Sequence, residues 1–529
     1  MPLLTPSRIL CAVLSFLLMG FLWTYGMPQQ HLTHQLPIIN HGGENLIPHL
    51  SAGKPAPPGA AGPSTPPTDV APMSTKAAST TPNTTCKDVR GAADVMVVVR
   101  TSKAELSAGL PKQLKTLLSC APNVAIFSDH AGTVDGFPVY DALESISPYR
   151  ITKYDEFREY EKIKADTEYK SSLKDAEALD KWKFLPMVYD AYQKAPSHRF
   201  YMFLEADTSL TWTNLLQWLD RLDYRIQYYT GAPVTTQNDM QVVQQSPGIL
   251  LSWGALRAYS KMYRERYAEE WESYVGKECC GDVMLATAMS ESHVELVSSW
   301  PLLQGEAPST LDWTERHWCA PIVSWHHMNS AEAELFKTTQ EKWSVKHGWA
   351  TPYLARDAFE ELVLPQLGEK KTDWDNISSD TVIKAEPGRK EKEAKDKAEQ
   401  ERKKDEEKKS REAEKSTEST LPPPPKAAPH ARRDTADDWE QLGHAIKEAA
   451  NSIENCQSIC NSSKDCLQWR YTPNNDGECH LGKVLLLGKK VEKGGQEWTS
   501  GWNMDRINKV TKDWKPCDEA DWRFNQQSA

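Results

Sequence analysis

The sequence lacks three patterns whose absence narrows the possible functions. Its 62 Lys and Arg residues are dispersed rather than gathered beside aromatic residues, and 73 Asp and Glu residues outnumber them, so nucleic acid is not an expected partner. The glycine-rich fingerprint of dinucleotide-binding proteins is missing. No two cysteines have the Cys-x2-Cys spacing common in zinc sites, which makes structural zinc an unfavoured explanation of the cysteines.

Charge is also absent from one long segment near the N-terminus, residues 9–27. Arg8 precedes this segment, and no acidic residue occurs before Glu44. About 18 apolar residues suffice to cross a bilayer. A cleaved signal peptide is the alternative, but its apolar core is normally shorter and ends at a small-x-small site, which residues 23–27 do not offer. We therefore expect a cytosolic tail at 1–8, a signal anchor at 9–27, and a single-pass type II protein of the Golgi or ER membrane.

Cysteines and glycosylation sequons agree with a lumenal location. Ten of the 11 cysteines follow the apolar segment, as expected in an oxidising compartment. They divide into two odd sets, Cys86, Cys120, Cys279, Cys280 and Cys319 in the centre and Cys456, Cys460, Cys466, Cys479 and Cys517 near the C-terminus. An interdomain bridge, an intermolecular bridge or a free thiol in each set would all explain these counts. Sequons begin at Asn83, Asn376 and Asn461, in polar stretches.

Composition divides the rest of the chain. Residues 28–88 are rich in Pro, Ala, Ser and Thr and have no apolar periodicity, which is typical of a disordered stem. Residues 366–437 contain a Lys/Glu-rich tract and a run of prolines, and we expect a linker there. Two folded domains are then predicted, at 89–365 and at 438–517.

The first of these domains has an α/β pattern. Strand-like segments at 94–99 and 123–127 flank leucines at helical spacing between 106 and 118, which predicts parallel strands joined by a right-handed crossover. Ligands of such sheets bind beyond the carboxyl ends of the strands. Thr101, Ser128 and Asp129 occupy these positions and are candidate nucleotide contacts.

An acidic pair follows a third, strongly apolar strand. The segment 200–204 leads directly into Glu205, Ala206 and Asp207. Acidic residues one position apart often only face water or cap a helix. A buried strand before them would nevertheless fix both carboxylates, and carboxylates are ligands of divalent cations that bind nucleotide diphosphates.

Two further segments supply possible partners of this pair. His326 and His327 follow the apolar run 321–325, and an imidazole is accepted by borderline metals such as Mn²⁺. Asp282 lies near the start of a predicted helix. It could simply interact with the helix dipole, or it could serve as a general base for a hydroxyl group.

The order of these motifs resembles glycosyltransferase family 31, which includes Fringe-like and core 1 β1,3-galactosyltransferase enzymes. The resemblance covers about residues 89–350 and rests on Glu205-Ala-Asp-Thr208, Gly248-Ile-Leu-Leu-Ser252, Gly281-Asp-Val-Met-Leu285 and Ser324-Trp-His326. It implies a GT-A-type, nucleotide-sugar-binding α/β domain with a mixed central sheet. The family usually has aspartate at the first acidic position, where this chain has Glu205.

The resemblance also assigns roles to the candidate residues. Asp207 and His326 would ligate Mn²⁺, with Glu205 contacting the metal or the ribose. Thr101 and Asp129, with Ser128 beside them, would lie near the uridine. Asp282 corresponds to the base of the family.

The implied activity is metal-dependent, inverting transfer of a sugar from a UDP-sugar donor to a glycoprotein or glycan acceptor. The specific expectation is a hexosyltransferase that moves galactose in β1,3 linkage to an O-glycan GalNAc-type acceptor. A Fringe-like β1,3-N-acetylglucosaminyltransferase is the alternative enzyme. The rival that is not an enzyme is a membrane-tethered carbohydrate-binding protein whose catalytic site has decayed, as the glutamate at position 205 would suggest.

The second predicted domain, 438–517, has closely spaced cysteines and a short β-rich segment. Cys456, Cys460 and Cys466 precede Cys479, and a Gly-Trp pair ends at Trp502. This pattern predicts a small disulfide-stapled module. It resembles a PAN/Apple-like domain, a class that binds protein or carbohydrate.

Overall fold

The computed structural model describes residues 85–522 except 107–109, 111–113, 115–117, 167, 237–238, 245, 414–445 and 515. The expected cytosolic tail, the anchor at 9–27 and the stem as far as residue 84 lie outside the described residues. Among the helices in the described part of the chain, none is both long enough and apolar enough to cross a membrane.

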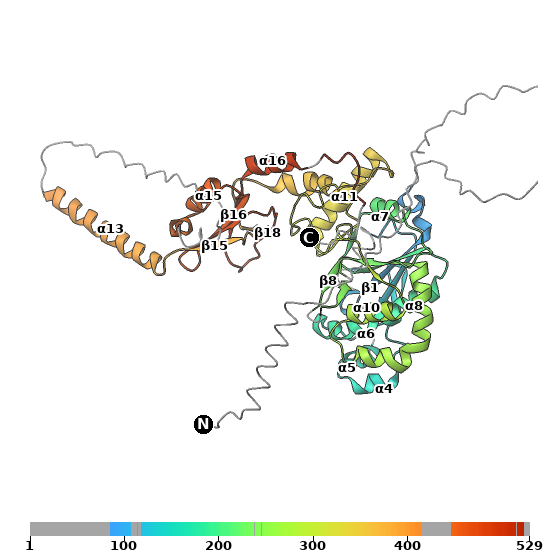
Figure 1. Cartoon of the computed structure of the whole chain (residues 1–529). Coiled ribbons are helices and arrows are strands. Elements are labelled where there is room, and N and C mark those ends of the chain that lie inside the picture. Colours follow the sequence, from blue (N-terminus) through green and yellow to red (C-terminus); the bar gives the residue numbers. More distant parts are fainter. Residues whose placement is uncertain are drawn as a thin grey trace, which may run out of the picture. The chain divides into compact units, whose positions relative to one another are not determined.

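A mixed eight-stranded sheet organises the first domain (Figure 1), in the order β11-β7-β10-β5-β1-β2-β4-β3. Its strands are β1 (Val95–Arg100), β2 (Val124–Ser128), β3 (Gly132–Val134), β4 (Phe137–Asp141), β5 (Phe200–Glu205), β7 (Tyr229–Gly231), β10 (Ile249–Ser252) and β11 (Leu296–Ser298). β1 runs parallel to β2 and β5, whereas β10 is antiparallel to β5 and to β7. The predicted strands at 94–99 and 123–127 and the mixed central sheet are therefore confirmed.

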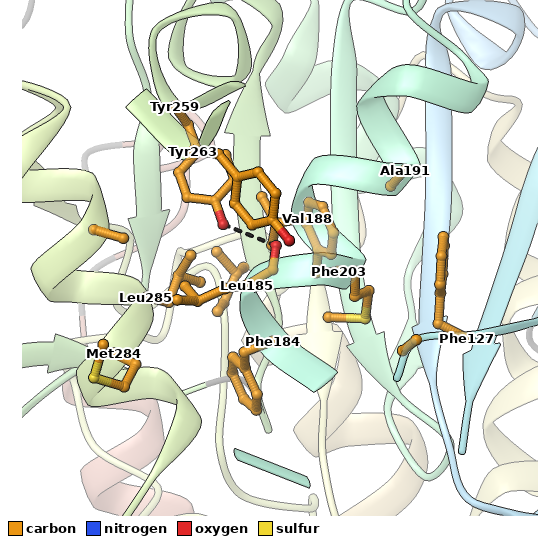
Figure 2. Close-up of a cluster of buried hydrophobic side chains, with 14 of the residues drawn as sticks. Phe127, Phe184, Leu185, Val188, Ala191, Phe203, Tyr259, Tyr263, Met284 and Leu285 are labelled. Atoms are coloured by element: carbon orange, nitrogen blue, oxygen red, sulfur yellow. Dashed lines mark hydrogen bonds between the residues drawn. The ribbon is translucent and has the colours of Figure 1, made fainter. Parts of the chain in front are cut away.

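Three helices cover one face of this sheet, and their apolar side chains form the main core (Figure 2). They are α6 (Leu173–Lys194), α8 (Trp253–Arg266) and α10 (Gly281–Glu291). Leu185 and Met284 pack with Phe203 of β5 in this core. The Tyr259 hydroxyl of α8 donates to the Leu185 carbonyl at 2.8 Å, which ties α8 to α6. The core therefore fixes α10 against the sheet.

Shorter elements complete the domain. The helices are α2 (Lys103–Leu106), α4 (Pro148–Lys153), α5 (Phe157–Ala165), α7 (Trp212–Leu219), α9 (Glu272–Val275), α11 (Ser330–His347) and α12 (Ala355–Ala358). Short 3-10 or π turns are η1 (Cys86–Asp88), η2 (Ala92–Asp94), η3 (Tyr267–Trp271), η4 (Phe359–Val363) and η5 (Leu364–Gln366). Two small antiparallel pairs are β6 (Ser209–Leu210) with β12 (Ser324–Trp325) and β8 (Pro233–Thr235) with β9 (Gln241–Val243).

The C-terminal domain is a five-stranded antiparallel sheet with helices beside it. Its order is β13 (Lys371–Thr372), β19 (Thr499–Trp502), β16 (Gln468–Thr472), β17 (Glu478–Gly482) and β15 (Thr381–Lys384). Outside this sheet, β14 (Trp374–Asp375) pairs with β18 (Lys489–Lys490). The remaining elements are α13 (Arg389–Ala413), η6 (Lys447–Asn451), α15 (Ile453–Ser462) and α16 (Met504–Asp513).

Strands β13 and β15 of this sheet, and β14 outside it, lie within residues 366–437, where we expected a linker. Every second residue of β15 is buried, and Ile383 is completely so. The strand is short and is followed by the charged helix α13, so its alternation is hard to recognise in the sequence. The chain thus enters the C-terminal domain before it reaches the charged tract.

The disulfides resolve the odd cysteine counts. Cys319 of the first domain bonds to Cys517, so one interdomain bridge accounts for both sets. The other pairs are Cys86–Cys120, Cys279–Cys280, Cys456–Cys479 and Cys460–Cys466. Around the interdomain bridge, the Trp318 and Trp514 rings lie 4.6 Å apart, and Trp313 donates its backbone N–H to the Leu485 carbonyl at 3.0 Å. The two domains therefore share packed contacts as well as a covalent link.

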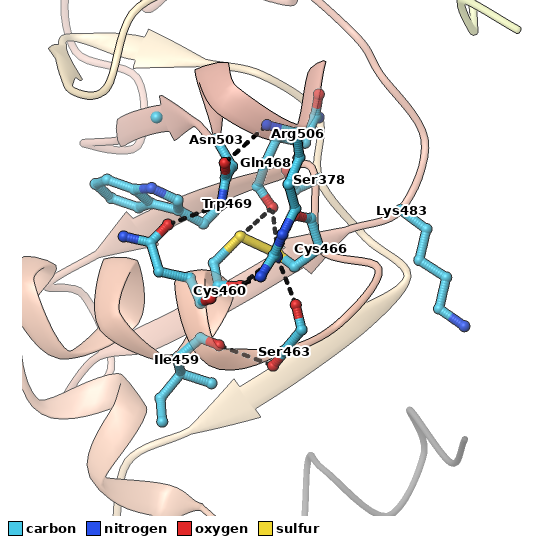
Figure 3. Close-up of a disulfide and its surroundings, with 12 residues drawn as sticks. Ser378, Ile459, Cys460, Ser463, Cys466, Gln468, Trp469, Lys483, Asn503 and Arg506 are labelled. Carbon is cyan, nitrogen blue, oxygen red and sulfur yellow. Dashed lines mark hydrogen bonds between the residues drawn. A yellow bond between two sulfur atoms is a disulfide. The ribbon is translucent and has the colours of Figure 1, made fainter. Parts of the chain in front are cut away.

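Arg506 of α16 holds the end of α15 (Figure 3). Its guanidinium donates to the carbonyls of Cys460, Ser463 and Cys466 at 3.0, 2.5 and 2.9 Å, and to that of Asn461 at 2.7 Å. The last carbonyls of a helix have no partner within the helix, so this one side chain satisfies several of them.

We expect Arg506→Met to lower the free energy of unfolding by about 2 kcal/mol, because carbonyls in a partly buried site lose a charged donor. Lys509→Met on the same helix is the matched control, since Lys509 is exposed. Urea unfolding of both variants measures the difference. An equal effect of the two substitutions would show that Arg506 contributes only its charge.

The sequon at Asn376 is buried, although it lies in a polar stretch of the sequence. Asn376 is 0% exposed, and its amide donates to the Trp469 carbonyl at 3.0 Å while its oxygen accepts from the Ser378 hydroxyl at 2.8 Å. Asn461, by contrast, is exposed. Asn83 lies outside the described residues.

For protein made in a secretory host, we expect glycopeptide mass spectrometry to find a glycan at Asn461 and none at Asn376. A glycan on Asn376 could not be accommodated without opening the sheet. Folded, secreted protein with a glycan at Asn376 would contradict the observed packing.

Candidate functional site

The site begins where two short strands bring distant segments together. β6 pairs antiparallel with β12, with Trp325 opposite Ser209 and Ser324 opposite Leu210. The residues just before β6 and just after β12 consequently meet, and these are Asp207 and His326. The strand β5 fixes the approach of the first segment, because it lies buried between β1 and β10.

Asp207 and His326 are in direct contact, and their role as ligands of one metal ion remains a prediction. The distance from Asp207 Oδ1 to His326 Nδ1 is 3.2 Å. Thr208 Oγ1 lies 3.2 Å from the same ring nitrogen and donates to the Ser246 carbonyl at 2.7 Å. The His326 side chain is 2% exposed, whereas that of Asp207 is 49% exposed. A buried imidazole is thus held beside a carboxylate that still faces solvent.

The third member of this cluster is His327, not Glu205. Asp207, His326 and His327 each offer one ligand atom, and these three atoms all lie within 4.8 Å of one another. His327 has a positive φ of 56°, a conformation uncommon outside glycine, and the centroid of its ring lies 3.8 Å from that of the His326 ring. The sequence offers both histidines as candidates, and the family resemblance points to His326 alone, whereas the structure places both beside Asp207.

Glu205 instead forms an ion pair. One of its carboxylate oxygens accepts from Arg100 Nη2, and the other lies 3.9 Å from His326 Nε2. Glu205 therefore borders the cluster and connects it to the end of β1.

Burial changes the pKa values of the two central residues. It lowers the pKa of His326 to about 4, with the neighbouring His327 acting in the same direction and Glu205 opposing. Burial also raises the pKa of Asp207, against the opposite effects of His327 and Arg100. His326 is therefore neutral at pH 7, which is the form of imidazole that binds metal ions.

A chain of charges extends from Glu205 into the protein and ends at the fully buried Lys183 and Asp129. Arg100 Nη1 lies 2.5 Å from Asp180 Oδ2, Lys183 Nζ lies 2.9 Å from Asp180 Oδ1, and Lys183 Nζ lies 3.3 Å from Asp129 Oδ2. The pKa of Asp180 is lowered because Lys183 and Arg100 together outweigh its desolvation by burial. Sequence reasoning missed Arg100, Asp180 and Lys183, although Asp180 and Lys183 are spaced to share one face of α6.

Thr101, Ser128 and Asp129 lie at the carboxyl ends of β1 and β2, but their side chains bond inward. The Thr101 hydroxyl donates to Glu105 at 3.2 Å, and the Ser128 hydroxyl donates to Asp129 Oδ1 at 3.2 Å. Asp129 also accepts the backbone N–H of Lys103 at 2.7 Å. These contacts hold the strand ends together, and direct contact with a uridine remains a prediction.

Asp282 lies in the first turn of α10 and lines a cavity shared with Glu205 and Arg100. The cavity has a volume of about 200 Å³, which is below the roughly 300 to 1,000 Å³ of drug-sized ligand pockets. Asp282 Oδ1 accepts the Val283 N–H at 2.8 Å, and burial raises the pKa of the carboxyl group. The structure thus brings Asp282 to one cavity with Glu205, the residue that borders the Asp207 cluster.

The close approach of α10 to α6 depends on Gly281. A Cβ atom at this position would lie 2.2 Å from Phe184 Cδ2. The Phe184 ring also lies 5.0 Å from the Arg100 guanidinium carbon. The Phe184 ring therefore lies between the start of α10, which contains Asp282, and Arg100, which forms an ion pair with Glu205.

Comparisons with known proteins add little to this geometry. No family model matches the chain, and no curated protein matches it. Among solved structures, the chain is similar to a glycosyltransferase involved in the glycosylation of the major capsid of PBCV-1, with 10% identity and a TM-score of 0.24, over 47% of this chain and 99% of that chain. A TM-score of this size is too low to support a fold or a function.

Proposed function

We propose that the protein is an inverting, metal-dependent glycosyltransferase that uses a UDP-sugar. The observation that carries the proposal is the contact between Asp207 and His326, two residues from distant segments, next to a cavity that contains Asp282. This arrangement would supply the two functions that the proposed reaction requires, a cation site for a diphosphate and a base for an acceptor hydroxyl.

The cluster suits a divalent cation. One carboxylate oxygen and two imidazole nitrogens form a mixed donor set that a borderline metal such as Mn²⁺ accepts. A half-exposed Asp207 leaves room for phosphate oxygens. When bound, the cation would offset the negative charge that develops on the departing UDP. Arg100, which is held beside Glu205, would add positive charge near the same diphosphate.

Asp282 is the proposed base. Its carboxylate would accept the proton of the acceptor hydroxyl while that oxygen forms a bond to the anomeric carbon. The bond from this carbon to the diphosphate breaks, and its electron pair leaves with UDP. The raised pKa of Asp282 strengthens it as a base toward the operating pH. One displacement of this kind converts an α-linked donor into a β-linked product.

Donor and linkage are proposed from the motif resemblance. We propose galactose transfer in β1,3 linkage to a GalNAc-type acceptor, in the Golgi or ER lumen, with a PAN/Apple-like C-terminal domain. One observation favours the non-enzymatic rival: Glu205 is paired with Arg100 and does not belong to the ligand cluster. A carbohydrate-binding protein could tolerate this pairing, because it needs no metal.

Turnover of a small donor panel distinguishes these functions. UDP-galactose, UDP-N-acetylglucosamine and UDP-glucose are each incubated with Mn²⁺, the purified protein and a benzyl α-GalNAc acceptor. We expect product from UDP-galactose and its loss on chelation of the metal. Product from UDP-N-acetylglucosamine alone would favour the Fringe-like alternative. No turnover with any donor, together with retained glycan binding, would favour the rival.

A further inference from the structure

Two adjacent cysteines, Cys279 and Cys280, are joined by a disulfide at the edge of the cavity that contains Asp282. Both are exposed, and Cys280 is the residue that precedes the first turn of α10. The bond closes a small ring that includes the peptide bond between the two residues. The two residues, which both line the cavity, therefore form a rigid part of its wall.

Cross-linking of the chain does not explain this bond. A disulfide stabilises a fold mainly by closing a loop in the unfolded chain, and the effect grows with the number of residues enclosed. The other disulfides join residues 6 to 198 positions apart, whereas this one joins residues 1 position apart. It therefore contributes little loop entropy, and a local role is the better explanation.

The disulfide supplies an apolar surface in a charged cavity. The lining includes four carboxylates and two cations, namely Glu177, Asp180, Glu205, Asp282, Arg100 and Lys181. Phe184 also lines it, but its ring is 6% exposed and packs against Arg100 and Gly281. Disulfide sulfurs are polarizable and, without a thiol hydrogen, donate no hydrogen bond, so they pair well with C–H groups.

A pyranose ring matches such a wall. Its edge carries hydroxyl groups, which bond to carboxylates and guanidinium groups, and its face carries axial C–H groups, which pack on apolar surface. The excess of carboxylates disfavours an anionic sugar such as a uronate. A rigid platform also costs little entropy when the ligand binds.

We propose that the Cys279–Cys280 disulfide is the platform on which an uncharged pyranose packs its C–H face, beside Asp282. This inference rests on the proposed glycosyltransferase function and adds a binding element to the same cavity. The sugar is either the hexosyl group of the donor or the terminal residue of the acceptor, and the kinetics below separate the two.

The test compares full-length wild-type protein with Cys279→Ser/Cys280→Ser. We expect the KM of one sugar substrate to rise about tenfold with kcat little changed, because the platform binds ground state and transition state alike. A rise in the donor KM assigns the donor sugar, and a rise in the acceptor KM assigns the acceptor. Inhibition by UDP alone is expected to be unchanged. Glu278→Gln, which keeps both sulfurs, is the control.

Three results would overturn the proposal. Unchanged KM values for both substrates would show that no sugar packs there. A fall in kcat at constant KM would show that the bond positions Asp282 instead. A large drop in the unfolding temperature would give the bond a structural role, whereas we expect almost none.

A binding measurement keeps this test separate from the proposed function. Saturation-transfer NMR with galactose and N-acetylgalactosamine reports which sugar protons contact the protein, whether or not transfer occurs. We expect strong transfer to the C–H protons of one face in wild type and its loss in the double-serine variant. Wild-type protein that shows this contact but no turnover would contradict the transferase function and leave the platform intact.

Discussion

Asp207→Asn and His326→Ala are each expected to reduce kcat/KM by about 10²- to 10³-fold or more, the size of loss seen when an electrostatic stabiliser of a leaving group is removed. Asparagine keeps the shape of the side chain but offers a neutral, weaker ligand. The alanine removes an imidazole that contacts Asp207 at 3.2 Å. Initial rates at several Mn²⁺ concentrations measure the effect.

The metal dependence distinguishes this loss from unfolding. We expect part of the activity of Asp207→Asn to return at high Mn²⁺, because a weakened site still fills at sufficient concentration. Asp155→Asn is the control, since the Asp155 side chain is 82% exposed and forms a surface ion pair with Arg158. Full activity of either site variant at low Mn²⁺ would show that the cluster holds no catalytic metal.

Asp282→Asn is expected to lower kcat by about 10²- to 10⁴-fold, the usual contribution of a general base. Binding of UDP should be preserved, because the proposed diphosphate contacts lie at the Asp207 cluster. Asp312→Asn is the control, because desolvation raises the pKa of that carboxyl too, although Asp312 is more exposed than Asp282, and because it does not line the cavity. Loss of UDP affinity in step with kcat would show that Asp282 supports the fold or the nucleotide instead.

The pH dependence follows from the same residue. Burial raises the pKa of Asp282, so the base becomes protonated at a higher pH than an ordinary aspartate. Activity should therefore fall as the pH decreases through this raised pKa, and Asp282→Asn should lose that limb of the profile. A raised carboxyl pKa means that the folded state disfavours the charged form of Asp282. The free energy of unfolding of Asp282→Asn at pH 7 should therefore be no lower than that of the wild-type protein.

The sequence predicted the structure where a local residue pattern determines a strand. Apolar runs identified β1, β2 and β5. The polar residues that follow β5 and β12 could be expected to meet, because each group follows an apolar run. Contacts that depend on side-chain direction were not visible in this way. The pairing of Glu205 with Arg100 and the turn of His327 toward Asp207 both depend on tertiary geometry.

Two other features escaped sequence analysis for physical reasons. Strands as short as β13 and β15 gain their stability from strands that come much later in the sequence. β13 pairs with β19, more than a hundred residues later, and β15 pairs with β17, nearly a hundred residues later. Disulfide connectivity depends on which cysteines the fold brings together, so the link from Cys319 to Cys517 could be named only as one of several options.

Binding of UDP to the purified protein, measured by calorimetry with and without Mn²⁺, tests the cation site most directly. UDP should bind tightly only when Mn²⁺ is present, and this dependence should disappear in Asp207→Asn and in His326→Ala. UDP that binds equally well with or without Mn²⁺, or equally well to wild type and both variants, would contradict a cation held by Asp207 and His326.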